Sequence, residues 1–250
     1  MDDHATGGAL SGARVQVWSE VFRDIVATFR KAPSPVPLDA VDHVDLITPP
    51  ALTAVAVMFG WTNRVLRSGE LILLAEEAGY LSEASPLVRS MFEHAMALHW
   101  VGDQGGAAVE ALYRARRREI TRLQSAQVAG WQFPDDVREL LDEFLSIGTD
   151  GGENDRLLHI KHRAKRYGLG HMYQAWLVEV WASHPTLASA KPYYRVDGST
   201  FELFDVPDEN RTTLVGQCLT AALLAVEAYN ELLANSYFKP HLERWNALLS

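Results

Sequence analysis

The sequence predicts an all-α protein: a multi-helix bundle of about eight helices with one small β-hairpin near 193–204. Three observations predict this fold. Apolar residues recur at a helical period along most of the chain, and prolines and glycines separate the periodic stretches. An Asp-Gly turn between aromatic and branched residues carries the strand signal. Because no repeat or low-complexity segment is present, we expect a single helical-bundle domain over 1–250.

The expected helices follow one another with short breaks. They cover 13–31, 51–79, 85–101, 107–130, 133–148, 156–168, 171–184, 208–235 and 241–249. Prolines stand before the second helix and Gly79 ends it, while Gly60 and Gly69 are positions where it could bend or divide. The turn-rich stretch GTDGGEND, 148–155, is the one plausible internal boundary.

Three of these helices are expected at the centre of the bundle. The stretches near 51–78, 85–101 and 208–235 are apolar around most of their circumference. A helix of that kind is buried on most sides. The other helices have one apolar stripe and are expected to surround this centre.

The composition excludes several classes of protein. The content of 48% hydrophobic and 22% charged residues is that of a folded globular chain. The net charge of −9 gives no general attraction for nucleic acid, so DNA is not predicted as a partner. One cysteine, Cys218, forms no disulfide framework and no cysteine-rich zinc site. No signal peptide and no apolar stretch of about 20 residues is found, so we expect a cytoplasmic protein without a membrane partner.

The hairpin is expected to pack on the bundle. The stretch PYYRVDGSTFELF places aromatic side chains on both sides of Asp197-Gly198. An isolated two-stranded ribbon is marginal in water and needs a surface. Only the short linker TLASAK separates it from His184-Pro185, so we expect it to cover that helix end, as a cap or as a lid over a pocket.

The stretch RSMFEHAMALHW places charged and imidazole groups in an otherwise apolar helix. Arg89 and Glu93 are four residues apart and therefore share a face. Two charges among apolar side chains are costly unless paired. We therefore expect a mutually paired and largely buried Arg89–Glu93, acting either as a tie that fixes helix register or as the floor of a pocket.

Arg89 and His94 also form the pattern R-x4-H. This pattern resembles the R-x4–6-H motif of the all-helical HEPN-type ribonucleases, which work without a metal. The resemblance implies that His94 acts as acid or base and that Arg89 holds the scissile phosphate. The chain contains two other arginine–histidine pairs at such spacings, about as many as chance supplies, so the pattern alone discriminates little.

A second stretch, HMYQAWLVEVWASHPTLAS, places Tyr173 and His184 three turns apart on one helix face. Together with LVRSMFEHAMALHWV it resembles a bacterial all-helical family of unknown function. That family has an arginine and a glutamate four apart in an early core helix, then a tyrosine and a His-Pro in a later one. Arg89, Glu93, Tyr173 and His184 match these positions, and the resemblance implies a loose link to HEPN-like folds.

The most basic segment is RLLHIKHRAKR, 156–166. It favours phosphate or RNA contact, or else a solvated helix face. The candidate phosphate-binding residues are Arg156, Lys161, Arg163, Lys165 and Arg166. His159 and His162 could share a metal, and Asp155 could join them, but at a helix start Asp155 is more simply a cap. Nothing else nearby completes a coordination shell, so neither a metal nor a cofactor is predicted.

Three functional hypotheses follow. The first is an uncharacterised binding or interaction protein whose Arg89, Glu93, Tyr173 and His184 line the bundle interior. The second is a HEPN-like, metal-independent ribonuclease in a toxin or phage-defence role, with RNA as its partner and His94 added to the catalytic set. The third is a small-ligand binder with an aromatic pocket closed by the hairpin. The sequence leaves open whether the chain is an enzyme and whether it forms a homodimer.

Overall fold

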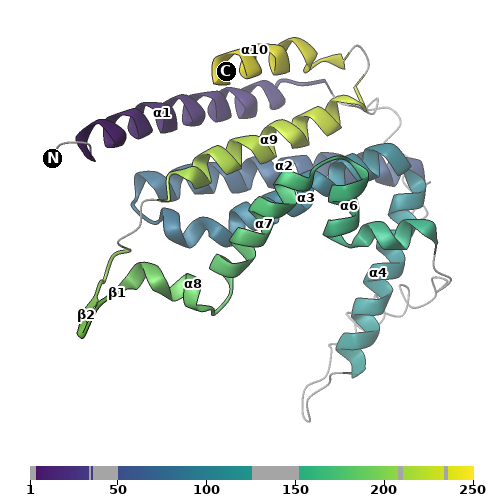
Figure 1. Ribbon diagram of the computed structural model, residues 1–250. Coiled ribbons are helices and arrows are strands. Elements are labelled where there is room, and N and C mark those ends of the chain that lie inside the picture. The colour runs from purple at the N-terminus through teal and green to yellow at the C-terminus, as the bar shows by residue number, and fades with distance from the viewer. Residues whose placement is uncertain (1–3, 34, 36–49, 126–151, 208–210, 234–235) are drawn as a thin grey trace.

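In the computed structural model, helices pack around three central ones (Figure 1). The structure describes all residues except 1–3, 34, 36–49, 126–151, 208–210 and 234–235. The expected helix at 133–148 and the start of the boundary at 148–155 lie outside the described residues.

The described helices and strands follow the predicted order. The α-helices are α1 (His4–Phe29), α2 (Pro50–Glu77), α3 (Ser85–Gln104), α4 (Gly106–Ser125), α6 (Ile160–Arg166), α7 (Gly170–Ser183), α8 (Leu187–Ala190), α9 (Thr213–Asn230) and α10 (Lys239–Leu249). Short 3-10 turns are η2 (Leu81–Ala84), η3 (Glu153–Leu158) and η4 (Lys191–Tyr193). The hairpin is β1 (Tyr194–Asp197) with β2 (Thr200–Leu203). The all-α prediction with one hairpin is confirmed.

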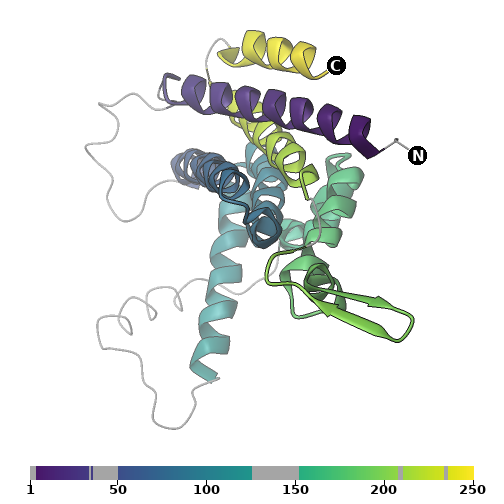
Figure 2. The same cartoon turned by 90° about the vertical axis from the view of Figure 1, so that its left-hand side faces the viewer.

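Helices α2, α3 and α9 form the centre, as their apolar circumference predicts. Each of the three contacts the other two. Helices α1 and α10 lie along α9 on the side away from α3, while α4 runs away from the bundle in both views (Figures 1 and 2). Trp100 of α3 and Tyr229 of α9 are among the largest fully buried side chains. None of the described helices has a stretch long and apolar enough to cross a membrane.

Helix α2 is continuous through Gly60 and Gly69, so neither glycine divides it. Gly69 serves a close approach instead. A Cβ at this position would lie 2.2 Å from Cζ of Phe22 and 2.9 Å from Sγ of Cys218. The missing side chain therefore lets α1 and α9 pack directly on α2.

The hairpin forms but does not cover the bundle. β1 and β2 pair antiparallel with Asp197 opposite Thr200. The turn is therefore Gly198-Ser199, one residue later than the expected Asp197-Gly198, because Gly198, with its positive φ of 59°, takes the first turn position. Its apolar side chains stay in solvent: Phe201 is 62% and Leu203 is 75% exposed. The ribbon projects from the molecule in both views (Figures 1 and 2).

The expectation that the hairpin caps or closes over His184 is therefore wrong. The six residues TLASAK are not an extended linker, because most of them fold into α8 and the start of η4. These turns carry the strands away from the end of α7. The base of the hairpin keeps a contact with the bundle, where the hydroxyl of Tyr193 donates a hydrogen bond to Glu83 of η2.

Candidate functional site

A connected polar cluster joins α3 to α7, which pack against each other. Nη1 of Arg89 donates a hydrogen bond of 2.9 Å to Nε2 of His184, the residue that ends α7. Nε of Arg89 lies 3.6 Å from Oε1 of Glu93. The predicted helical pair therefore exists, and the His-Pro at the end of the later helix meets it.

Tyr173 joins the same cluster through a residue that sequence reasoning missed. Oε1 of Glu93 accepts a hydrogen bond of 2.9 Å from the indole Nε1 of Trp176. The indole ring stacks on Tyr173 with ring centroids 5.5 Å apart and an angle of 17° between the planes. The spacing of three residues between Tyr173 and Trp176 places both rings on one face of α7, and a part-buried indole N–H needs an acceptor. That reasoning could have found Trp176.

The expected burial of Arg89–Glu93 is wrong. The side chain of Arg89 is 29% exposed and that of Glu93 is 37% exposed. Their apolar neighbours Met91, Phe92 and Ala95 are buried, whereas the charged pair lies at the open edge between α3 and α7. The cluster is therefore only partly buried and is not sealed in the core.

His94 faces a different neighbour from Arg89. Its Nδ1–H donates a hydrogen bond of 2.7 Å to the backbone oxygen of Ser90, and its ring meets Trp61 of α2 edge-on at 5.7 Å. Burial lowers the pKa of His94, and the positive charges of Arg64 and Arg163 lower it further. Because Arg89 is directed to His184 on α7 and His94 to Trp61 on α2, the R-x4-H pair is not assembled around one point.

Arg163 occupies an unexpected place. Predicted on an exposed basic face, it is only 9% exposed and lies over the ring of Trp100, with Cζ 5.9 Å from the ring centroid. Burial lowers the pKa of its guanidinium to about 10, against the opposing effect of Glu93. Its Nε has no hydrogen-bond partner among the residues that the structure describes. Within the described part of the chain it also forms no ion pair.

Three of the other predicted cations line a separate cleft of about 530 Å³. Arg156, Lys165 and Arg166 surround it together with His162. Lys161 is exposed and does not line this cleft. The ring centroids of His159 and His162 are 6.1 Å apart. No cluster of three metal-binding side chains occurs in the part of the chain that the structure describes.

A second missed element is the ion pair between Glu179 of α7 and Arg211. Nη2 of Arg211 lies 2.9 Å and 3.1 Å from the two carboxylate oxygens. Glu179 is fully buried, and the Arg211 side chain is 13% exposed. Nothing in the local pattern signals this pair, because 32 residues separate its members.

Comparison with known protein families places the chain. A protein-family model described as a family of unknown function, DUF5677, matches residues 55–198, more than half of the chain. The chain belongs to this family. The DUF5677 segment contains the whole α3–α7 cluster and the basic cleft, while Arg211 lies outside it.

The predicted membership in a family of unknown function is thus confirmed, whereas the HEPN link and the ribonuclease activity gain no support. No curated protein matches this DUF5677 chain. No solved structure matches it either.

Proposed function

We propose that the protein binds a ligand carrying an oxyanion, a phosphate or carboxylate group, where α3, α6 and α7 meet. The observation that carries this proposal is Arg163, a guanidinium that is 9% exposed and has no ion-pair partner in the part of the chain that the structure describes. Removing such a charge from water costs several kcal/mol unless an opposite charge compensates it. A bound oxyanion supplies that compensation.

The charges around Arg163 favour an anion over a cation. Glu93 is the carboxylate whose charge acts on Arg163, but it also serves Arg89 and accepts the Trp176 N–H. Two guanidinium groups therefore share one carboxylate, which leaves a local excess of positive charge. The face of Trp100 offsets part of this charge through a cation–π contact. Guanidinium groups bind carboxylate and phosphate oxygens through paired, charge-assisted hydrogen bonds.

Two residues on which this charge acts are partly exposed to solvent. Glu93 and His94 are both part-exposed, and the charge of Arg163 acts on each of them. His94 uses Nδ1–H for the Ser90 carbonyl, which leaves Nε2 as a hydrogen-bond acceptor. A ligand that carries a hydroxyl or a protonated phosphate oxygen can donate to that atom. The proposal develops the first of the three hypotheses, that of a binding protein, and adds the chemical class of the ligand.

Thermal unfolding tests the proposal. At about 10 mM inorganic phosphate and a dissociation constant near 1 mM, Tm should rise by about 3–5 °C over a chloride buffer of equal ionic strength. Arg163→Gln should abolish this increment. Lys161→Gln, which removes an exposed charge from the same helix, should keep it. An increment that is absent from the native protein, or equal in Arg163→Gln, contradicts the proposal.

The basic cleft supports a second candidate, binding of RNA or another phosphate polymer. Its cations Arg156, Lys165 and Arg166 stand out in a chain of net charge −9. If single-stranded RNA binds there, log K should fall with log salt at a slope of about −2, since roughly three phosphates would be neutralised. Lys165→Gln should reduce that slope, and Arg163→Gln should leave it unchanged. Fluorescence anisotropy with a labelled oligonucleotide measures both.

A further inference from the structure

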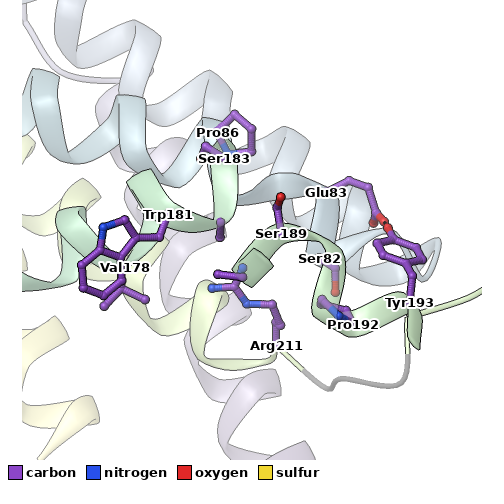
Figure 3. A pocket seen from close by; sticks show the side chains of 12 residues that line it. Ser82, Glu83, Pro86, Val178, Trp181, Ser183, Ser189, Pro192, Tyr193 and Arg211 are labelled. Atoms are coloured by element: carbon purple, nitrogen blue, oxygen red, sulfur yellow. The ribbon is translucent and has the colours of Figure 1, made fainter. Parts of the chain in front are cut away.

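A hollow of about 390 Å³ lies at the C-terminal end of α7, next to the base of the hairpin (Figure 3). Its walls come from η2, the start of α3, the end of α7, α8, η4 and Arg211. The volume is that of a site for a small organic molecule. None of the residues in the α3–α7 cluster lines it, so it is a separate feature.

The two ends of the hollow differ in chemistry. Val178 and Trp181 form an apolar wall at one end and are 47% and 59% exposed (Figure 3). At the other end the hydroxyl of Tyr193 donates to Oε1 of Glu83. Among the described residues no hydrogen bond uses Oε2 of Glu83, so this oxygen can accept one from a ligand.

The charge in the hollow is negative. Arg211 lines it, but both oxygens of the buried Glu179 neutralise that guanidinium, and Ser85 accepts another of its hydrogen bonds. Glu83 and Arg211 are the charged residues that line the hollow. Among the described residues Arg211 has an ion-pair partner and Glu83 has none. A cation that enters the hollow gains from this carboxylate, and an anion is repelled by it.

We propose that this hollow is a second binding site, which takes a small organic cation: an ammonium or guanidinium group on a flat or aliphatic body. The cation pairs with Glu83 at the polar end, where the hydroxyl of Ser82 is a further acceptor. The body covers the exposed face of Trp181 and so removes apolar area from water. The site does not depend on the oxyanion site, since its charge has the opposite sign and its residues are different.

Titration with phenethylamine, followed by NMR at the indole N–H of Trp181, tests the proposal. The Trp181→Phe variant identifies this resonance. Phenethylamine should shift it to saturation, and Glu83→Gln should weaken the binding about fivefold, since the variant keeps the acceptor for Tyr193 but removes the charge. Glu243→Gln, an exposed carboxylate change on α10, should leave the binding unchanged.

Phenylacetate, of similar size and opposite charge, serves as the second probe. Weaker binding of phenylacetate than of phenethylamine supports the cation site. Phenylacetate binding as tight as that of the amine shows that Arg211 governs the hollow and overturns the proposal. A Trp181 resonance that neither probe moves, or amine binding that survives Glu83→Gln unchanged, overturns it as well. None of these outcomes depends on whether phosphate binds at Arg163.

Discussion

Two arginine–glutamate pairs in this molecule differ in sequence separation and in burial. Arg89 and Glu93 are four residues apart on α3, 3.6 Å from each other, and 29% and 37% exposed. Arg211 and Glu179 come from distant parts of the chain, lie 2.9 Å apart, and are 13% and 0% exposed. The pair that the sequence predicts, Arg89–Glu93, has the longer distance and the greater solvent exposure of the two.

The difference shows what helical spacing can determine. A separation of four residues brings two side chains to one face, whatever surrounds that face. It does not determine whether another helix covers them. An exposed pair contributes little to stability because water and salt screen it. It stays available to ligands, however, which a sealed pair does not.

The largest expected effect is at the buried pair. Glu179→Ala should lower the free energy of unfolding by about 3–5 kcal/mol, because it leaves Arg211 with little solvent and no counter-charge. Urea denaturation measures the loss. In the double variant Glu179→Leu/Arg211→Met the loss should be smaller than in the single variant, since no charge stays unpaired. A single variant that loses under about 1 kcal/mol would mean that the pair is not buried in solution.

The next largest effect should have the opposite sign. Arg163→Met replaces a buried guanidinium by an apolar side chain beside Trp100. In a buffer without oxyanions it should raise the free energy of unfolding by about 1–3 kcal/mol. Such a gain is typical where a native residue is kept for binding rather than stability. A clear destabilisation in the same denaturation experiment would indicate that Arg163 has a structural partner.

A smaller effect is expected at the exposed pair. Glu93→Ala should cost about 1–2 kcal/mol, below the value for the sealed pair. Arg89 keeps His184 and part of its hydration, whereas the indole N–H of Trp176 loses its acceptor and Arg163 loses the nearby negative charge. Urea denaturation of Glu93→Ala and Glu179→Ala measures this difference in stability. If the two variants have the same denaturant slope, their midpoints can be compared directly. Equal losses in the two variants would remove the distinction between the pairs.

The smallest effect depends on pH and comes from His94, beside the exposed pair. Burial holds the pKa of His94 below its usual 6.5, so the unfolded chain takes up the proton first as the pH falls. The stability is therefore complete above about pH 6.5 and is lost as the pH falls towards the folded-state pKa. His94→Asn should lose less stability than the native chain between about pH 7.5 and pH 5.5. His99, whose pKa burial also lowers, should retain part of the dependence. An identical loss in both proteins contradicts this assignment.

Much of the architecture follows from the sequence alone. Periodicity of 3.6 residues is a local property, and it predicted α3 and α7 close to their observed positions, whereas α1 begins nine residues before the expected start. The apolar circumference of α2, α3 and α9 predicted their central place, since such helices cannot face water. The Asp-Gly turn predicted the hairpin because its backbone requirement is local as well. The convergence of Arg89, Glu93 and His184 was expected through the family resemblance.

Tertiary structure decided what these elements face. Whether Arg89–Glu93 is covered, whether Arg163 points to solvent or to Trp100, and which residue pairs with Glu179 all depend on how helices distant in sequence pack together. The direction of the hairpin depended on α8 and η4, two short turns whose stability comes from their surroundings. Local spacing determines which side chains share a face; only the packing of that face determines its solvent exposure, its charge balance and therefore its chemistry.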